Sequence, residues 1–288
     1  MNRFVNINGW GFVSLSLALI LAFAVYPIIQ SLWLSTQVGK GVVTEFGGLT
    51  NVYRLFRDPL FKTALFNTFI FLLVQVPIML TLALVLANTL NNPDLKYKNL
   101  FRIAIFLPCV TSLVAYSLLF KGMFSQDGVI NSFLLNLHLI NEPIGWLTDP
   151  FWAKITIITA ITWRWTGYNM IFYIAALQNV DRSIYEAADL EGANAFQKFT
   201  RITVPMLKPV ILFTTVISTI GTLQLFDEIM NITNGGPANS TITLSVYIYK
   251  LSFQYVPNFG YAATVSYVIV LIVALLSILQ FKVAGKDA

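Results

Sequence analysis

The sequence has very little of the side-chain chemistry on which soluble enzymes depend. Its 288 residues include one cysteine, Cys109, and one histidine, His138, and charged residues make up 11% of the total. A single cysteine excludes a disulfide within the chain. A histidine with no cysteine or carboxylate cluster near it argues against a metal centre and against acid–base catalysis. The phosphate-binding pattern Gly-x-x-x-x-Gly-Lys-Ser/Thr is also missing. We therefore predict that the chain is not an enzyme, hydrolyses no ATP and holds no cofactor or metal of its own.

Long apolar runs stand in place of these features. Hydrophobic residues account for 57% of the chain, and charged residues fall well below the roughly one quarter that is usual in soluble domains. The sequence therefore predicts an all-α membrane protein, with residues 1–288 forming a single transmembrane domain. The net charge of +5 does not indicate nucleic-acid binding, because the basic residues lie beside the apolar runs. A crossing helix needs about 20 apolar residues, and six runs qualify: about residues 10–32, 64–90, 102–120, 151–177, 209–229 and 260–281.

The first run has two interpretations. Ala22-Phe23-Ala24 imitates a cleavage site, with Arg3 upstream, as in a secretory signal. The apolar run continues through Ile29, so we favour an uncleaved span. Lysine and arginine are more frequent in the short loops on one side of the predicted spans, which places both termini in the cytoplasm.

Other signals lie within and between the runs. Pro77 predicts a kink in the second run, and glycines break regular structure in residues 36–62. Apolar residues at 130–137 share one helix face, so a surface helix is expected there. Residues 242–249 suggest a strand within a polar loop.

The polar segment 180–207 contains two helix starts. Ser183 and Glu186 have the spacing of a capping box, in which each side chain caps a backbone N–H of the other. Asn194 and Gln197 repeat that spacing. A segment that only joined two spans would need no such signals, so we expect two short ordered helices.

The ends of these helices are also marked. Gly192 accepts a left-handed backbone and should end the first helix, and Pro205 should end the second. On the first helix Ile184, Ala187 and Ala188 share one stripe. Small side chains there allow a partner protein to approach closely. The alternative is an interfacial helix that lies on lipid headgroups.

The spacing of this segment resembles the signature loop of the permease subunits of binding-protein-dependent ABC importers. That signature reads Glu-Ala-Ala, three residues, Gly, nine residues, Ile-x-Leu-Pro, and valine replaces its leucine here. The matching residues are Glu186-Ala187-Ala188, Gly192 and Ile202-Thr203-Val204-Pro205. Further pieces are similar to the sugar-permease branch, which includes the maltose and glycerol-phosphate permeases: Asp58-Pro59-Leu60-Phe61, Asn67-Thr68, Phe106-Leu107-Pro108, Gly235-Gly236-Pro237 and Gly260-Tyr261-Ala262-Ala263.

This resemblance implies a fold, partners and a location. The fold is six transmembrane helices with a cytoplasmic coupling helix between the fourth and fifth. The partners are a second homologous permease, two ABC ATPase subunits that bind ATP and Mg²⁺, an extracytoplasmic solute-binding protein, a sugar and membrane lipid. The location is the inner or plasma membrane of a bacterium or archaeon. The residues implied in coupling to the ATPase are Glu186, Ala187, Ala188, Gly192 and Pro205.

Polar side chains inside the fourth and fifth runs are candidates for a substrate path. Aromatic rings pack on the C–H faces of sugars, and amides and hydroxyls pair with sugar hydroxyls. The alternatives are an aromatic belt for the tryptophans and helix packing for the small polar residues. The resemblance to the maltose permease points to the same two runs and includes Leu225. The candidates are Arg164, Trp165, Tyr168, Asn169, Ser218, Gly221, Thr222, Gln224 and Asp227.

Arg164 requires a partner, because a cation inside a span is costly unless it is paired or hydrated. An ion pair with Asp227 or Glu228 is one hypothesis, and a position nearer the outer boundary is the other.

The resemblance implies import of a carbohydrate, and of an oligosaccharide in particular, by alternating access. The alternative is an ion-coupled secondary transporter of sugars or other small polar solutes. Its only candidate carboxylates, Asp227 and Glu228, lie at the end of a run, and no repeat of the two halves is evident. A membrane-embedded enzyme lacks a catalytic cluster.

Overall fold

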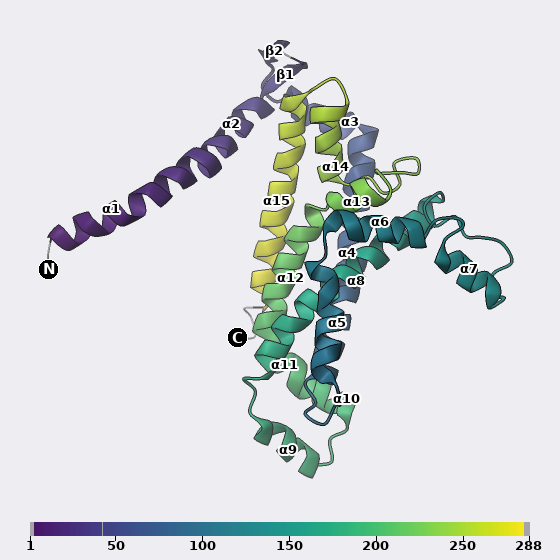
Figure 1. Ribbon diagram of the computed structural model, residues 1–288. Coiled ribbons are helices and arrows are strands. Elements are labelled where there is room, and N and C mark those ends of the chain that lie inside the picture. The colour runs from purple at the N-terminus through teal and green to yellow at the C-terminus, as the bar shows by residue number, and fades with distance from the viewer. Residues whose placement is uncertain (1–2, 42, 285–288) are drawn as a thin grey trace. The chain divides into compact units, whose positions relative to one another are not determined.

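The structure is a computed structural model that describes residues 3–41 and 43–284, most of them in helices (Figure 1). The chain forms two compact units. Unit 1 comprises Met1–Pro59 and Tyr247–Val268, and unit 2 comprises Leu60–Val246 and Ile269–Ala288. The long helix α15, Phe259–Ala284, contributes its first part to unit 1 and its remainder to unit 2.

Unit 1 begins with a long apolar helix. α1 (Arg3–Ile20), a π-helical turn (Leu21–Val25) and α2 (Tyr26–Ser35) follow one another without a break. The side chains of Trp10–Ser35 are not buried by other parts of the chain. An apolar helix that the protein does not cover is suited to contact with lipid. The prediction of an uncleaved span at residues 10–32 is compatible with this helix.

The connection after α2 is more regular than its glycines suggest. β1 (Gln37–Lys40) and β2 (Val43–Phe46) form an antiparallel hairpin, with Gln37 opposite Phe46, and α3 (Thr50–Arg57) follows. The Asn51 side chain donates hydrogen bonds to the carbonyl oxygens of Ser35 (3.0 Å) and Gln37 (2.7 Å). These bonds fix α3 to the end of α2.

A carboxylate cluster joins the parts of unit 1 that lie far apart in the sequence. The hydroxyls of Tyr247 and Tyr261 donate to Asp58 at 2.5 and 2.6 Å. The Arg54 guanidinium lies 3.9 Å from the centre of the Tyr261 ring. Burial and the Asp58 carboxylate raise the pKa of Tyr247, so its hydroxyl stays a donor. The cluster therefore holds the chain before α4 against the segment around α15.

Unit 2 contains most of the remaining helices. Its long helices are α4 (Pro59–Leu90) and α8 (Pro150–Leu177), and its medium helices are α5 (Lys98–Val110), α6 (Leu113–Met123) and α12 (Lys208–Leu223). The expected surface helix is present as α7 (Val129–Asn136). The short elements are α9 (Arg182–Leu190), α10 (Ala195–Lys198), a π-helical turn (Phe199–Thr203), α11 (Val204–Met206), α13 (Asp227–Ile232), α14 (Leu244–Tyr249), which runs into unit 1, and a further π-helical turn (Lys250–Gln254) in unit 1.

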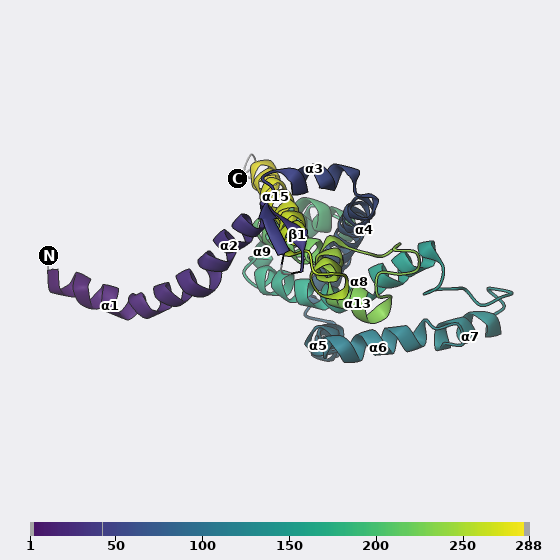
Figure 2. The ribbon, with the colours of Figure 1, turned by 90° about the horizontal axis from the view of Figure 1, so that it is seen from above.

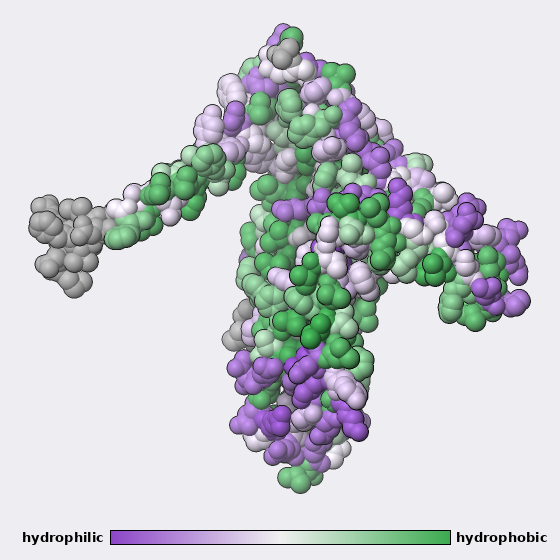
Figure 3. Space-filling model, viewed as in Figure 1, coloured by the Kyte–Doolittle hydropathy of each residue, from purple (hydrophilic) through white to green (hydrophobic). Residues whose placement is uncertain are grey.

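Three helices of the described chain are long and apolar enough to cross a membrane: Trp10–Ser35, Pro59–Leu90 and Phe259–Val283. Two bent pairs raise the number to five if each pair is one span: Lys98–Val110 with Leu113–Met123, and Ala195–Met206 with Lys208–Leu223. Five of the six predicted spans thus have a helical counterpart with a membrane-compatible composition. In Figure 3 the surface over α5 and α12 is mainly hydrophobic, and the end of unit 2 that carries α9 and α10 is mainly hydrophilic.

The predicted fourth span corresponds to α8, which is too polar to be counted among the helices that are apolar enough to cross a membrane. Its polar residues Thr156, Arg164, Thr166 and Asn169 are buried in the protein. α8 also packs closely on α5, because a Cβ atom at Gly167 would lie 2.0 Å from the carbonyl oxygen of Ile105. A helix surrounded by other helices does not need the hydropathy of a lipid-facing one.

Two predicted spans are broken. The run 102–120 bends by 100° between α5 and α6, at Thr111 and Ser112. Figure 2 shows α5 almost end-on with α6 leading away from it. The run 209–229 is interrupted at residues 224–226, between α12 and α13. Hydropathy detects apolar composition and not direction, so neither break was predicted.

The prediction of a strand at 242–249 was wrong, because the segment contains helix α14. The Thr243 hydroxyl accepts a hydrogen bond from the N–H of Val246 (3.4 Å), and the N–H of Leu244 donates to the Thr68 hydroxyl (3.1 Å). Ile242, Leu244 and Val246 are all buried. Thr241 and Thr243 are buried as well, and the threonine hydroxyls bind backbone N–H groups of the segment.

Candidate functional site: a polar loop and an aromatic-walled cavity

Helix α9 begins two residues earlier than its capping-box spacing suggested. The Asp181 carboxylate, and not Ser183, caps the helix by accepting a hydrogen bond from the N–H of Ser183 (3.0 Å). This bond lowers the pKa of the exposed Asp181 carboxyl.

The end of α9 lies at Gly192, as predicted, with φ of +77°. The N–H groups of Gly192 and Ala193 donate to the carbonyls of Asp189 and Ala188. This is the pattern of a Schellman turn, in which a left-handed residue closes the helix.

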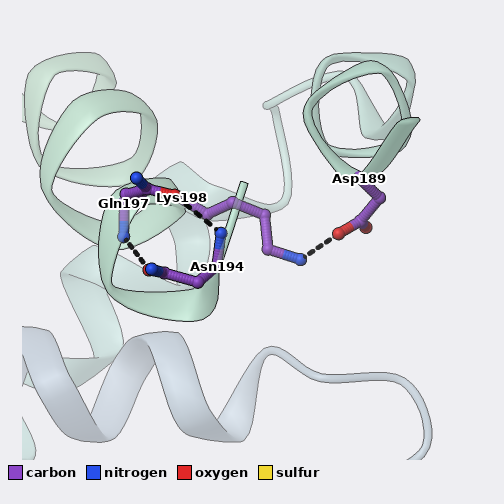
Figure 4. Close-up of polar contacts among 4 residues, drawn as sticks. All are labelled: Asp189, Asn194, Gln197 and Lys198. Atoms are coloured by element: carbon purple, nitrogen blue, oxygen red, sulfur yellow. Dashed lines mark hydrogen bonds and ion pairs between the residues drawn. The ribbon is translucent and has the colours of Figure 1, made fainter. Parts of the chain in front are cut away.

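The second helix begins as predicted and ends differently. Asn194 and Gln197 form a reciprocal capping box, with N–H···O distances of 2.9 and 2.8 Å (Figure 4). The helical course then continues through Pro205, which occupies the first turn of α11, and bends by 72° at Leu207. Proline fits the first helical turn because its missing N–H is not needed there, so the prediction that Pro205 ends the helix was wrong.

Three contacts connect the two helices of this loop to each other and to α4. Lys198 Nζ pairs with Asp189 Oδ1 at 2.5 Å (Figure 4). The Tyr185 and Thr203 hydroxyls are 3.0 Å apart, and the Thr203 hydroxyl donates to Asn88 Oδ1 at 3.4 Å. The loop is therefore held as one ordered body against the end of α4.

The predicted apolar stripe of α9 is only partly on the surface. Glu186 and Ala187 are exposed, whereas Ala188 is 9% exposed and packs within its own chain. Ile184 of the stripe is 37% exposed, and two large apolar side chains outside the stripe are more exposed, Leu190 (92%) and Phe196 (74%). Sequence reasoning missed both, although a leucine and a phenylalanine in a polar loop were a signal.

A cavity of about 550 Å³ lies in unit 2, between residues of α4, α6, α8, α12 and α13. Eight of the nine side chains proposed for a substrate path line it. They are Trp165, Tyr168, Asn169, Ser218, Gly221, Thr222, Gln224 and Asp227. The structure thus gathers residues from two separate runs into one site.

The polar groups of this cavity are partly connected to one another. Trp165 and Tyr168 form an edge-to-face pair with ring centres 5.6 Å apart. The Thr222 hydroxyl donates to Gln75 Oε1 (3.1 Å), and Asn169 Nδ2 donates to the Trp165 carbonyl (3.0 Å). The site offers an aromatic wall next to amide, hydroxyl and carboxylate groups. Among the described residues, no three His, Cys, Asp or Glu side chains come together as a metal site.

Arg164, the ninth candidate, does not line the cavity. Its guanidinium donates to the carbonyl oxygens of Pro108 (3.3 Å), Cys109 (3.4 Å) and Thr111 (3.1 Å), at the bend between α5 and α6. Within the described chain, neither Asp227 nor Glu228 lies within 4.0 Å of it, so the ion-pair hypothesis was wrong. A broken helix leaves carbonyls without partners, and the guanidinium supplies the missing donors.

The rings of Tyr116 and Trp165 complete the surroundings of this cation. The Arg164 guanidinium carbon lies 4.8 Å from the centre of the Tyr116 ring and 5.6 Å from that of the Trp165 ring. Arg164 is 5% exposed. It connects the bend to a wall of the cavity without reaching the cavity itself.

Comparison with known proteins assigns the chain to a family. Residues 64–284 match the model of the binding-protein-dependent transport system inner membrane component. The chain belongs to this family. The match covers more than half of the chain, and the resemblance inferred from segment 180–207 is confirmed.

Two curated relatives of this inner membrane component are transport permeases. The lactose transport system permease protein LacF of Rhizobium radiobacter is 64% identical over 288 residues, which are 99% of this chain and 97% of that protein. The arabinooligosaccharides transport system permease protein AraP of Bacillus subtilis (strain 168) is 34% identical over 269 residues, 92% and 85% of the two chains. Both belong to the branch that the sequence motifs indicated.

A solved structure shares the fold of this inner membrane component. The crystal structure of a bacterial alginate ABC transporter, in complex with an alginate pentasaccharide-bound periplasmic protein, contains a chain that matches with a TM-score of 0.85. The two chains are 23% identical, and the match covers 96% of this chain and 94% of the other.

Sequence reasoning missed several residues that line the cavity. Gln75 and Met79 come from α4, whose run looked uniformly apolar. Glu228 was considered as a partner of Arg164 and as an ion-coupling carboxylate, and was not among the nine candidates for the substrate path. A glutamine in the middle of an apolar run was the available signal. The remaining lining residues are Leu113, Ile161, Ile217, Leu225 and Phe226, of which Leu225 had been indicated by the resemblance.

Proposed function

We propose that the chain is the membrane-spanning permease subunit of an ABC importer that moves a carbohydrate, of disaccharide or oligosaccharide size, into the cytoplasm. The observation that carries the proposal is the cavity of about 550 Å³ walled by Trp165 and Tyr168. Its volume lies in the range of small-molecule sites, about 300–1,000 Å³. Family membership and the 64% identity to a lactose permease support the same cargo class.

The lining of the cavity suits a sugar in chemical terms. Trp165 and Tyr168 offer apolar ring surface, and Asn169, Ser218 and Gln224 offer amide and hydroxyl groups. A sugar ring presents C–H groups on its faces and hydroxyls around its rim, so it contacts both kinds of surface. Alternating access would expose this site to one side of the membrane at a time.

The proposal includes six crossings with both termini in the cytoplasm. The three apolar helices and the two bent pairs account for five. α8 is the sixth, shielded from lipid by its neighbours over most of its length. The loop 180–207 then lies on the cytoplasmic side, after the fourth crossing.

On that side, α9 and α10 dock into an ABC ATPase. Glu186 is exposed and available to a basic residue of the partner, and Leu190 and Phe196 supply apolar contact area. ATP and Mg²⁺ bind to two such ATPase subunits. A second homologous permease and an extracytoplasmic binding protein complete the assembly, which lies in the membrane of a bacterium or archaeon.

Uptake of radiolabelled lactose tests the cargo and the energy source together. The complete transporter is reconstituted in proteoliposomes with ATP inside and the binding protein outside. We expect uptake that requires hydrolysable ATP and is insensitive to a protonophore. Uptake that proceeds without ATP and stops with the protonophore would establish the ion-coupled alternative instead.

The coupling loop gives a second prediction. We expect Glu186→Lys and Gly192→Asp to lower uptake at least about tenfold while the complex still assembles and hydrolyses ATP. Glu186→Lys reverses an exposed charge at the docking surface. Gly192→Asp forces a side chain onto φ of +77°, which costs roughly 1–2 kcal/mol and disturbs the turn after α9. The ratio of sugar transported to ATP hydrolysed is the measurement.

Glu191→Lys is the matched control, because it makes the same charge change on a neighbouring exposed residue of the loop. It should leave the ratio near the wild-type value. Normal coupling in both test variants would remove Glu186 and Gly192 from the proposed docking role.

A further inference from the structure

The ionisable side chains that line the cavity are all acidic. Its lining includes two carboxylates, Asp227 and Glu228, and no lysine, arginine or histidine. Asp227 is exposed to the cavity side and Glu228 is 5% exposed, and both come from the first turn of α13. An anion in this space would therefore meet the Asp227 carboxylate, and no lysine, arginine or histidine lines the space to compensate it.

The nearest candidate cation is turned away from the cavity. Three hydrogen bonds direct the Arg164 guanidinium to the carbonyls of Pro108, Cys109 and Thr111. The guanidinium does not line the cavity, so an anionic cargo held there would not contact it. The wall between the bend and the cavity consists of aromatic rings, of which Trp165 lies against both.

The neutral groups of the cavity offer both hydrogen-bond donors and hydrogen-bond acceptors. Gln75 Nε2 donates to Met79 Sδ, and Asn169 Nδ2 donates to the Trp165 carbonyl. Gln224 and Ser218 also line the cavity and add an amide and a hydroxyl donor. In the described chain, Asn169 Oδ1 and the Asp227 carboxylate accept no hydrogen bond from another side chain. Hydroxyl groups are donors that these acceptors can bind, whereas a carboxylate or sulfate offers acceptors only.

We propose that the cavity selects neutral, hydroxyl-rich saccharides and rejects acidic ones, with Asp227 and Glu228 as the residues that determine this specificity. The inference rests on the proposed function, because it assumes that the cargo enters this cavity. It adds the charge class of the cargo, which neither the family nor the fold defines. Like charges at close range in a site of low polarity repel strongly, so the effect should be large enough to measure.

Binding to the permease–ATPase complex without the binding protein tests the proposal, because the binding protein would impose a selectivity of its own. The complex is placed in lipid nanodiscs, and the probes are lactose and its anionic counterpart lactobionate. We expect the wild type to bind lactose at least about tenfold more tightly than lactobionate. Isothermal titration calorimetry at several salt concentrations measures both constants.

The double variant Asp227→Asn, Glu228→Gln keeps the shape of both side chains and removes their charge. We expect it to reduce the preference for lactose to within about threefold, mainly through tighter binding of lactobionate. Glu45→Gln, on the exposed strand β2, removes a carboxylate outside the cavity and should keep the wild-type preference. Each single variant and a thermal melt show whether a change comes from charge or from loss of structure.

Two results would overturn the inference. Equal affinity of the wild type for the two probes would exclude selection by charge and leave carbohydrate import intact. An unchanged preference in a folded double variant would assign the selectivity to other residues. If the wild type bound neither probe nor any other saccharide, the proposed function would fail and this inference with it.

Discussion

Replacing Gly167 with alanine is expected to remove most of the correctly folded protein from the membrane. A Cβ atom at this position would lie 2.0 Å from the carbonyl oxygen of Ile105, 2.7 Å from its carbonyl carbon and 2.9 Å from the Cα of Phe106. All three are backbone atoms of α5, so no side-chain rotation relieves the overlap. Overpacking in a core generally costs about 1–3 kcal/mol, and here the helices α5 and α8 must separate.

The measurement is the amount and melting temperature of monodisperse protein in detergent. Gly122→Ala is the matched control, because Gly122 also lies within a helix, α6, and its added Cβ would meet nothing within 4 Å. That control should melt at or slightly above the wild-type temperature, since alanine is the better helix former. A Gly167→Ala protein that was as abundant and as stable as the control would show that α5 and α8 are not packed this closely.

Replacing Arg164 with leucine is expected to disable transport and to lower the melting temperature by several degrees. The change removes the guanidinium bonds of three carbonyl groups at a 100° bend, and of these the Pro108 carbonyl keeps the Thr111 hydroxyl as a donor (2.7 Å). An unsatisfied buried polar group costs about 1–3 kcal/mol, and the apolar surroundings offer no replacement. The position of Trp165 in the cavity wall also depends on this contact. We expect uptake to fall at least about tenfold.

Arg164→Lys distinguishes charge from geometry. Lysine keeps the positive charge but lacks the planar fork that reaches several acceptors at once, so it should recover only part of the stability and uptake. Lys154→Leu removes a different cation from α8 and should have a smaller effect. Wild-type behaviour of Arg164→Leu would mean that the bend is stable without the guanidinium.

The parts of the fold that could be predicted from the sequence are those whose cause is local. Lipid contact requires long apolar runs, so five of the six runs correspond to apolar helices or helix pairs. The turn at Gly192 and the capping box at Asn194 depend on residues a few positions apart, and both were predicted. The cap at Asp181 is also local, but the Ser-x-x-Glu pattern beside it was the more familiar signal.

The parts that could not be predicted depend on residues far away in the sequence. The break at Thr111 is held by Arg164, 53 residues further along, and no pattern near either residue indicates the other. The helix α14 likewise relies on Thr68, 176 residues from Leu244. In the cavity, polar residues on α8 and α12 were recognisable, whereas Gln75 was concealed within an apolar run.

The helix α4 contacts both of the sites described above. Asn88, near its end, accepts the hydrogen bond from Thr203 in the polar loop, and Gln75 forms part of the cavity wall. With a rise of about 1.5 Å per residue, roughly 20 Å of helix separates them. If the loop were displaced along this axis, the one helix α4 would connect that displacement to the cavity. Pro77 lies between the two residues and removes a backbone hydrogen bond of α4. The stiffness of α4 at Pro77 therefore determines how much of such a displacement would reach the cavity.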